Sequence, residues 1–293
     1  MTGKIIKGIA GFYYVHDGNN TVYACRAKGI FRNRGLKPVV GDDAMFSVLD
    51  EASSEGTIDE ILPRKNLLVR PASANVDQAL ILFAVTQPEP NFNLLDRFLI
   101  MMAAQGIPVS ICFNKTDLAG QKKREEYRKI YEKSGYPVLF LSVRERTGLE
   151  EIRAFLKGKT TILAGPSGVG KSSLTNLLLP EALMETGSIS ERIGRGRHTT
   201  RHAELFCVDE GTYLMDTPGF SSMHLTEIEA NELKDYFPEF EDYASRCRFQ
   251  ADCVHIGEPV CGVKEALGRG EISRSRYENY CLLYRELKER KKY

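Results

Sequence analysis

Apolar and polar residues alternate over short stretches in the first part of the chain, from residue 3 to about residue 68. Turn-forming runs such as Asp17-Gly18-Asn19-Asn20 separate these stretches, and a period of two broken by turns is typical of β-strands. The pattern predicts strands at residues 5–6, 11–15, 21–25, 44–49 and 56–58. Five short strands in so few residues predict a small closed barrel, and we expect an OB-fold.

The pattern changes after Arg70-Pro71-Ala72-Ser73, which resembles a linker. Continuous apolar runs now alternate with amphipathic segments, as in parallel sheets whose strands are buried on both faces. We predict strands at 76–85, 109–113, 138–141 and 161–164, and helices at about 94–104, 122–133, 148–156 and after residue 170. Strands that alternate with helices indicate an α/β fold with helices on both faces of the sheet.

The remainder of the chain has a third character. A polar, basic and glycine-rich loop, 189–202, precedes two strands at 204–208 and 212–215 that we expect to form a hairpin. Helical segments and a Cys/His cluster follow from about residue 223, and a charged helix ends the sequence. We therefore predict three domains, with boundaries at 1–68, 69–222 and 223–293, the last mainly helical.

Composition limits the class of protein without indicating a partner. The chain has 42% hydrophobic and 27% charged residues and a formal net charge of +1, values typical of a soluble globular protein. Seven dispersed cysteines favour a reducing compartment over a disulfide framework. We find no signal-like N-terminus and no apolar run of about 18 residues, and so expect a cytoplasmic protein that does not bind membranes.

One segment fits the phosphate-binding pattern G-x-x-x-x-G-K-[ST]. It reads Gly165-Pro166-Ser167-Gly168-Val169-Gly170-Lys171-Ser172-Ser173 and lies between a predicted strand and a predicted helix. Such a loop directs backbone N–H groups toward a polyphosphate at a helix N-terminus. We expect Lys171 to contact the β- and γ-phosphates and the Ser172 hydroxyl to bind Mg²⁺, within a nucleotide-binding segment that extends to Ser173.

A second motif indicates that the base is guanine. Asn114-Lys115-Thr116-Asp117 directly follows the strand at 109–113 and matches N-K-x-D. The Asp117 carboxylate can accept from the N1–H and 2-amino groups of guanine, a donor pair that adenine lacks. Asn114 would contact the base or tie the motif to the P-loop. Ser142, followed by Val143 where alanine is usual, resembles the loop that closes over guanine.

Residues near the γ-phosphate come from later in the chain. Asp216-Thr217-Pro218-Gly219 matches D-x-x-G, in which Asp216 would bind Mg²⁺ through water and Gly219 would sense the γ-phosphate. Of Thr199 and Thr200, we expect Thr200 to bind Mg²⁺ when GTP is present. Phe220 occupies the place where Ras-like enzymes have the water-orienting Gln. We therefore expect His198 to orient or deprotonate the attacking water.

The order of these motifs is unusual. In an ordinary GTPase the P-loop comes first, followed by the switch threonine, D-x-x-G and N-K-x-D. Here N-K-x-D and Ser142 precede the P-loop. This order indicates a circularly permuted GTPase domain, which can form the same sheet because domain termini usually lie close together at the surface. Permutation also places D-x-x-G immediately before the C-terminal domain.

The C-terminal cluster has the residue types of a metal site. Cys247, Cys253, His255 and Cys261 offer three thiolates and one imidazole within a short segment. A Cys₃His set is typical of a closed tetrahedral zinc site, so we expect one structural Zn²⁺. Because no ligand position remains open, such a zinc would stabilise the domain and catalyse nothing.

A basic segment in the barrel suggests a contact with nucleic acid. Cations on both sides of an aromatic ring suit a groove in which charges follow phosphates and a ring stacks on a base. The predicted RNA-binding residues are Arg26, Lys28, Phe31, Arg32, Arg34 and Lys37, together with Arg195 and Arg197 of the later basic loop.

Together, the barrel, the permuted motifs, the Gly194–His202 loop and the Cys/His cluster resemble the RsgA family of small-ribosomal-subunit-dependent GTPases over essentially the whole chain. The resemblance implies a cytoplasmic protein, which we expect to be a monomer, that binds GTP and GDP and engages the 30S subunit and its 16S rRNA. It also implies subunit-stimulated GTP hydrolysis during late maturation, followed by release. One spacing departs from the family: five residues, where four are usual, separate Cys247 from Cys253.

The sequence leaves three alternative functions open. The first is a GTP-gated RNA-binding chaperone in which hydrolysis is incidental, which the Phe220 substitution permits. The second is a nuclease or RNA-modifying enzyme that uses the metal, against which a four-ligand site argues. The third is a P-loop ATPase, opposed by Asn114 and Asp117.

Overall fold

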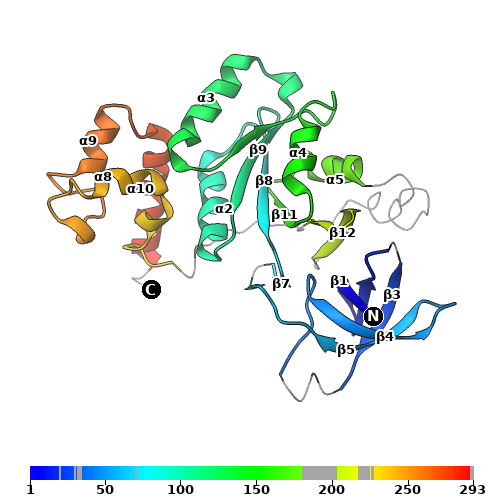
Figure 1. Ribbon diagram of the computed structural model, residues 1–293. Coiled ribbons are helices and arrows are strands. Elements are labelled where there is room, and N and C mark those ends of the chain that lie inside the picture. The colour runs from blue at the N-terminus through cyan, green and yellow to red at the C-terminus, as the bar shows by residue number, and fades with distance from the viewer. Residues whose placement is uncertain are drawn as a thin grey trace. The chain divides into compact units, whose positions relative to one another are not determined.

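The computed structural model of the protein describes residues 1–19, 21–29, 31, 35–69, 71–179, 203–216, 225 and 228–290 (Figure 1). These residues form two compact units. The first unit comprises residues within 1–80, 149–164 and 170–220. The second comprises residues within 81–148, 165–169 and 221–293. No helix in the described part of the chain is both long and apolar enough to cross a membrane.

The N-terminal strands close into a barrel in the order β1-β2-β3-β5-β4. The strands are β1 (Thr2–Ile9), β2 (Phe12–His16), β3 (Val22–Ala27), β4 (Asp43–Asp50) and β5 (Glu55–Ile61). Their inward side chains, including Ile5, Val15, Phe46 and Ile58, are almost fully buried and form one hydrophobic core. The predicted five-stranded barrel is therefore confirmed, with longer strands than the sequence pattern indicates.

A central sheet of six strands has the order β10-β9-β8-β11-β13-β12. Its strands are β8 (Gln78–Ala84), β9 (Val109–Asn114), β10 (Val138–Phe140), β11 (Thr160–Ala164), β12 (Glu204–Asp209) and β13 (Thr212–Asp216). The pairs β9–β10 and β11–β13 are parallel, and β12 and β13 form the predicted antiparallel hairpin. Every residue of β8, β9 and β11 is buried, which explains their continuous apolar runs.

Helices connect these strands close to the predicted positions. They are α2 (Phe92–Ala104), α3 (Gln121–Tyr131), α4 (Leu149–Leu156) and α5 (Lys171–Leu178), with short 3₁₀ helices η1 (Thr116–Leu118) and η2 (Glu132–Ser134). Helix α2 begins after Asn91, whose side chain accepts a hydrogen bond from the backbone N–H of Leu94. The order of strands and helices confirms the predicted α/β sheet.

The segment interpreted as a linker is more ordered than its composition suggests. It adjoins a two-stranded sheet of β6 (Leu67–Leu68) and β7 (Ser73–Ala74). Ser73 is fully buried, and the N–H of Ala74 donates to the carbonyl oxygen of Val40 at 2.9 Å. These contacts fix β7 against the barrel, so Ser73 belongs to a packed strand instead of a loose connection.

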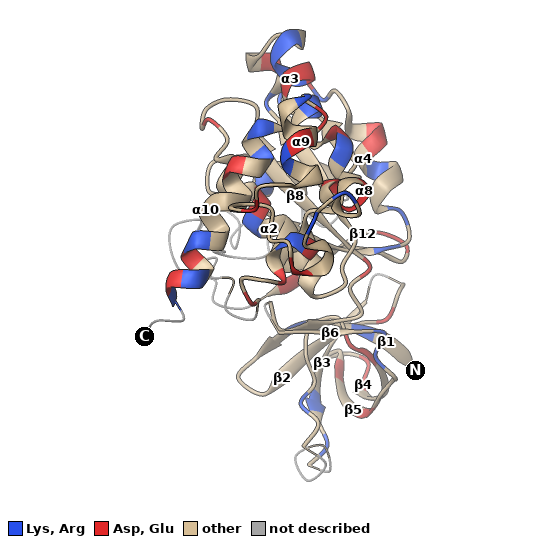
Figure 2. Ribbon diagram, turned by 90° about the vertical axis from the view of Figure 1, so that its left-hand side faces the viewer, with Lys and Arg blue, Asp and Glu red and all other residues tan. Residues whose placement is uncertain are grey.

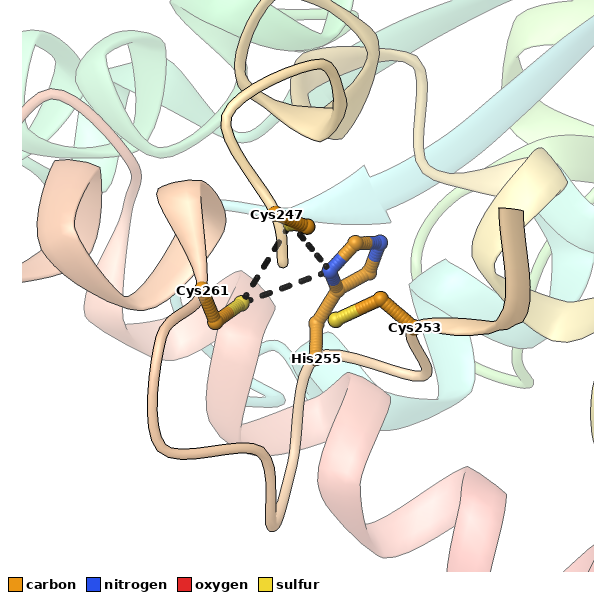
Figure 3. A group of neighbouring side chains, drawn as sticks. All are labelled: Cys247, Cys253, His255 and Cys261. Carbon is orange, nitrogen blue, oxygen red and sulfur yellow. Dashed lines mark hydrogen bonds between the residues drawn. The ribbon is translucent and has the colours of Figure 1, made fainter. Parts of the chain in front are cut away.

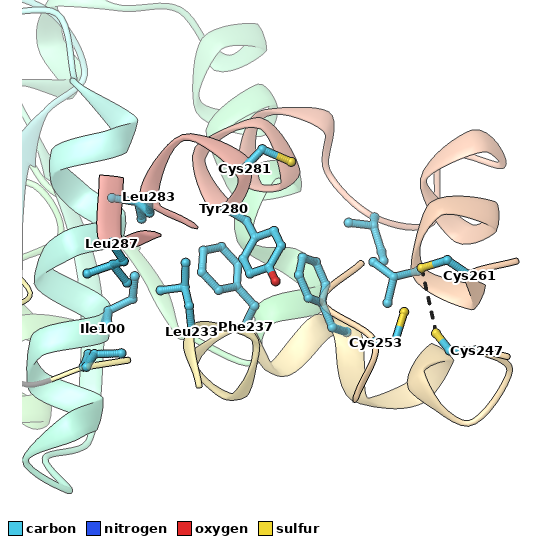
Figure 4. Close-up of a cluster of buried hydrophobic side chains, with 14 of the residues drawn as sticks. Ile100, Leu233, Phe237, Cys247, Cys253, Cys261, Tyr280, Cys281, Leu283 and Leu287 are labelled. Atoms are coloured by element: carbon cyan, nitrogen blue, oxygen red, sulfur yellow. Dashed lines mark hydrogen bonds between the residues drawn. The ribbon is translucent and has the colours of Figure 1, made fainter. Parts of the chain in front are cut away.

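The C-terminal region is mainly helical, as predicted. Its elements are η3 (Leu233–Tyr236), η4 (Pro238–Phe240), α8 (Glu241–Ala244), η5 (Gln250–Asp252), α9 (Gly262–Gly268) and α10 (Arg274–Arg290). Basic and acidic residues alternate along α10 (Figure 2). Its apolar side chains, with Phe237, Leu233 and Ile100 of α2, form a core that reaches the cysteine cluster (Figure 4).

A buried ionic network connects α2 to this C-terminal region. The Arg276 guanidinium, which is 0% exposed, donates to Asp96 Oδ1 at 2.6 Å and to both carboxylate oxygens of Glu239 at 2.7 and 3.1 Å. Asn279 and Tyr131 also donate to Asp96. Two buried carboxylates thus share one buried cation, and burial raises the pKa of Asp96 despite the opposing attraction of Arg276.

Candidate nucleotide and metal sites

The P-loop begins at the end of β11, which neighbours β8 in the sheet. Gly165 has φ +147°, and a Cβ there would lie 2.0 Å from the carbonyl oxygen of Leu82. No residue with a side chain fits at this position without separating the two backbones. Farther along the loop, Ser167 and Gly168 are exposed, and Gly170 at φ +99° leads into α5. The loop therefore presents exposed backbone at a helix N-terminus, as phosphate binding requires.

Asn114 ties together three loops at the carboxyl ends of the strands. Its amide nitrogen donates to the carbonyl oxygen of Val169 in the P-loop at 2.8 Å. Its Oδ1 accepts from the N–H groups of Lys115 and Val143 at 2.7 and 3.1 Å. Of the two roles left open by the sequence, the geometry shows the tie to the P-loop. The buried amide thereby fixes the guanine motif relative to residues 165–169.

Lys115 provides a second connection between the same two loops. It has a left-handed backbone, with φ +66°, and its ammonium group donates to the carbonyl oxygen of Gly168 at 2.8 Å and to that of Gln87. These contacts hold the aliphatic part of the side chain along the loop. From the sequence motif we expect the aliphatic stem of Lys115 to lie along the plane of the bound guanine. This expectation remains a prediction.

Asp117 and Ser142 lie together, as their motifs predict. The Ser142 hydroxyl donates to Asp117 Oδ1 at 2.5 Å and accepts from the N–H of Glu145 at 3.1 Å. Asp117 is exposed, whereas Ser142 is 1% exposed. The buried hydroxyl orients one carboxylate oxygen, and the exposed carboxylate can accept from the donor pair of a guanine base. Thr116 is buried, and its N–H donates to the carbonyl oxygen of Leu141 at 3.2 Å.

The helix that follows the P-loop carries the cation and hydroxyls expected near phosphates. Ser172 and Ser173 are exposed at its first turn. Burial lowers the pKa of Lys171, while the attraction of Asp216 at the end of β13 opposes this shift. Lys171 is thus close enough to the D-x-x-G carboxylate for the two charges to interact, which is the charge pattern of a Mg²⁺–triphosphate site.

Four buried donor atoms converge in the C-terminal region (Figure 3). They belong to Cys247, Cys253, His255 and Cys261, and all lie within 4.8 Å of one another. His255 Nδ1 is 3.5 Å from the Cys247 sulfur and 3.4 Å from the Cys261 sulfur, and these two sulfurs are 3.8 Å apart. The longer spacing between Cys247 and Cys253 therefore does not keep Cys247 out of the cluster.

The cluster fits a tetrahedral metal ion. Zn–S bonds of about 2.3 Å place two thiolates of a tetrahedron about 3.8 Å apart, and the shorter Zn–N bond places imidazole and thiolate about 3.6 Å apart. The observed separations match these values. Burial is the largest cause that raises the pKa of Cys253 to about 12, so without a cation this thiol keeps its proton. A bound metal would supply the charge that thiolates need.

A set of contacts holds the loop that carries His255. Both Glu258 carboxylate oxygens accept backbone hydrogen bonds, from Val254 at 2.7 Å and from Ile256 at 2.8 Å. Tyr277 donates to the His255 carbonyl oxygen and Tyr280 to that of Val254, each at 2.6 Å. Sequence analysis does not identify Glu258, although it is the acidic residue between His255 and Cys261. Its contacts preset the loop for metal binding.

The expected RNA-binding segment divides into two groups. Arg26, Lys28 and Lys37 are exposed, and Arg26 lies over the Phe12 ring with 4.5 Å between its guanidinium carbon and the ring centroid. Phe31 differs from the expectation that its ring can stack on a base, because it is 6% exposed and packs in the barrel core. A ring that lies between basic residues in the sequence can still point inward, and here the Phe31 ring forms part of the barrel core.

Several expected site residues lie outside the described part of the chain. They are Arg32, Arg34, Arg195, Arg197, His198, Thr199, Thr200 and Gly219. Their expected roles in RNA binding, Mg²⁺ binding and water activation remain predictions.

Two family models match the chain. The model described as RsgA GTPase matches residues 61–226, and the RsgA N-terminal domain matches residues 2–58. Among curated relatives, a small ribosomal subunit biogenesis GTPase RsgA of Agathobacter rectalis is 55% identical and aligns over 100% of both chains. Its counterpart from Alkaliphilus metalliredigens is 50% identical over 99% of both chains.

Solved structures show the same similarity. YjeQ from Thermotoga maritima superimposes with a TM-score of 0.80, at 38% identity over 98% of both chains. YloQ, described as a circularly permuted GTPase, has a TM-score of 0.77 at 37% identity, over 99% of this chain and 95% of that one. Because these matches extend over nearly the full length, and not over the P-loop alone, the chain belongs to the RsgA family of circularly permuted GTPases.

Proposed function

We propose that this protein binds the 30S ribosomal subunit and hydrolyses GTP to GDP and phosphate, with stimulation by that subunit, during late maturation of the small subunit. The observation that carries the proposal is the Asn114 tie between the guanine motif and the P-loop, found in a chain whose full-length relatives are small ribosomal subunit biogenesis GTPases. A loop pair held in this way is suited to GTP, and the names of the full-length relatives support a ribosomal partner.

In the proposed reaction each sequence motif has its own role. Asp117 and Ser142 select guanine, and Gly165–Ser173 bind the phosphates through backbone N–H groups, with Lys171 at the β- and γ-phosphates. Ser172 and Thr200 would hold Mg²⁺, which would supply positive charge to neutralise the charge that develops on the phosphates. Asp216 would help to hold that ion, and Gly219 would sense the γ-phosphate.

His198 is our candidate for orienting the attacking water. Phe220 follows D-x-x-G and its apolar ring cannot position water, so another residue must do so. GTP with Mg²⁺ would order the 189–202 loop, and contacts of the 16S rRNA with Arg195 and Arg197 would fix His198 near the γ-phosphate. Hydrolysis would release this loop and weaken ribosome binding.

We further propose three domains, with residues 1–68 contacting 16S rRNA, 69–222 binding nucleotide and 223–293 held by one structural Zn²⁺ on the Cys₃His cluster. The exposed Arg26, Lys28 and Lys37 support the RNA contact, and Arg32 and Arg34 belong to the same basic segment. The proposal places a monomeric protein in the cytoplasm, where its ribosomal partner is assembled.

The test is GTP turnover by the purified protein with and without 30S subunits, with 50S subunits and ATP as controls. Stimulation by 30S subunits alone, and only with GTP, is the expected result. Equal slow turnover under every condition would refute ribosome activation.

Phe220 also favours one second candidate, a GTP-gated RNA-binding chaperone in which hydrolysis is incidental. A His198→Ala variant separates the two proposals. Loss of both stimulated turnover and maturation activity, with retained 30S binding, supports the GTPase mechanism. Normal maturation activity in a variant that cannot hydrolyse GTP supports the chaperone.

A further inference from the structure

Side chains of the barrel strands β1 and β2 contact the β12–β13 hairpin. Lys7 of β1 donates to Glu204 of β12 at 2.9 Å, and the two side chains are only 13% and 20% exposed. His16 of β2 lies 2.9 Å from the Tyr213 hydroxyl of β13, and Lys4 lies over the Tyr213 ring, 5.6 Å from its centroid. We call these five residues the clasp. Burial excludes water from most of it, which strengthens its polar contacts.

The hydrogen-bond roles in the clasp follow from its geometry. The backbone N–H of Gly18 donates to His16 Nδ1 at 3.3 Å, so Nδ1 is an acceptor and the Tyr213 hydroxyl donates to it. His16 and Tyr213 are 4% and 5% exposed. Burial lowers the pKa of His16 and raises that of Tyr213 to about 12, which keeps both groups neutral. The contact is therefore a directed hydrogen bond between two buried neutral groups.

The clasp lies on the hairpin that joins the 189–202 loop to the D-x-x-G motif at 216–219, and we call these two stretches of sequence the switch segments. Glu204 is the first residue of β12, which follows the 189–202 loop, and it pairs directly with Asp216 across the hairpin. Asp216 is the last residue of β13 and opens the D-x-x-G motif. Tyr213 lies on the same strand as Asp216. Lys7 thus holds the residue opposite Asp216, and His16 holds the strand that leads to it.

The same barrel strands continue to the proposed RNA-binding segment. β2 pairs antiparallel with β3, with His16 opposite Val22 at one end and Phe12 opposite Arg26 at the other. A regular hydrogen-bonded sheet therefore connects exposed Arg26 to the clasp. RNA that shifts or stiffens this face acts on a rigid element that contacts both ends of the hairpin.

We propose that the clasp couples the barrel to the switch segments, with Lys7, Glu204, His16 and Tyr213 as positioning residues for the RNA-stimulated reaction. The inference rests on the proposed function and adds a physical route between RNA contact and hydrolysis. Coupling between two sites is reciprocal for binding free energies. The proposal therefore includes an effect of nucleotide state on the barrel, and this effect can be measured without ribosomes.

The first experiment measures amide hydrogen exchange in β1 and β2 of the full-length protein, with GDP and with a non-hydrolysable GTP analogue. We expect exchange rates to differ between the two nucleotides in the wild type. The difference should disappear in Lys7→Met and Tyr213→Phe and return in the charge swap Lys7→Glu/Glu204→Lys. The matched control is Lys65→Met, which removes a 2.6 Å ion pair to Asp77 that does not involve the hairpin.

The second experiment measures 30S-stimulated turnover of the same variants. Coupling free energies in proteins correspond to factors of about 5–150, so we expect stimulated kcat to fall by at least about 5-fold. The KM for GTP, basal turnover and 30S binding should stay at wild-type values. A variant that is merely less stable would also lose basal turnover and 30S binding, so unchanged values of both distinguish coupling from loss of stability.

The two experiments separate the outcomes. Equal barrel exchange with both nucleotides in the wild type, or an unchanged difference in Lys7→Met and Tyr213→Phe, overturns the coupling even if 30S subunits stimulate turnover. A wild type without 30S stimulation overturns the proposed function, and the exchange difference with its loss in the variants still supports the clasp. Wild-type stimulation in Lys7→Met, at normal 30S binding, also contradicts the inference.

Discussion

Replacing Arg276 by methionine tests what connects α2 to the C-terminal region. Methionine fills a similar volume but removes the charge that Asp96 and Glu239 share. In the intact protein the attraction of these carboxylates raises the pKa of Arg276 against the opposing effect of burial. After the substitution, both carboxylates stay buried without a cation, because the Phe237 and Tyr131 rings close the site on the arginine's other sides.

The expected loss follows from the burial of every partner. Arg276 and Asp96 are 0% exposed and the Glu239 side chain is 3% exposed, so water cannot replace the lost bonds. Removing one partner from such a buried group typically costs about 3–5 kcal/mol. Replacing Asp96 and Glu239 by leucine in the same variant should recover only part of this loss. The change removes the buried charges, but it leaves the Tyr131 hydroxyl and the Asn279 amide without their acceptor.

Urea unfolding followed by circular dichroism is a suitable assay, because the chain has no tryptophan. Arg269→Met, which breaks an exposed pair with Glu271, is the control and should leave the midpoint almost unchanged. The loss in Arg276→Met should shrink between pH 7 and pH 5. An unpaired buried carboxyl has a raised folded-state pKa, so its penalty is relieved as the pH falls toward the unfolded value of about 3.9. A loss below about 1 kcal/mol at pH 7 would refute the argument, since it would mean that water or a rearranged partner solvates the carboxylates.

Three further predictions concern the nucleotide loop, the metal loop and the barrel. Gly165→Ala should abolish GTP binding and lower the unfolding midpoint more than the control Gly158→Ala. Gly158 also has a positive φ, but a Cβ there would meet nothing within 4 Å. Equal effects of the two variants would show that the close approach of Gly165 to Leu82 is unimportant. Glu258→Gln should weaken zinc affinity by about 10–100-fold, measured in competition with a chromophoric chelator. The control Glu265→Gln, at an exposed position, should leave the affinity unchanged. Equal zinc affinities of the two variants would show that Glu258 does not support the metal-binding loop. Burial lowers the pKa of His16 against the opposing Asp17, with Lys4 and Tyr213 nearby. Its contribution to stability is therefore present above the unfolded pKa of about 6.5 and lost as the pH falls through the lower folded value. The melting temperature should drop more between pH 7.5 and 5.5 in the wild type than in His16→Gln, and parallel curves would contradict this assignment.

The order of the domains and motifs could be predicted from the amino-acid sequence alone. Period-two alternation predicted the barrel, continuous apolar runs predicted the buried strands β8, β9 and β11, and the P-loop and N-K-x-D motifs predicted a permuted order. These features are local: each depends on a few neighbouring residues whose backbone or chemistry allows little choice. The same holds for the four metal ligands, whose residue types and spacing indicated a tetrahedral site.

Contacts between residues that are distant in the sequence could be assigned only from the folded chain. The sequence left Asn114 with two possible roles, and the fold placed its amide against Val169. It offered Phe31 as a stacking ring, and the barrel core buried it. Arg276 and Asp96, or Lys7 and Glu204, are far apart in the chain, and no local pattern distinguishes them from charged surface residues. Their pairing depends on strand order and helix packing, which arise only when the whole core closes.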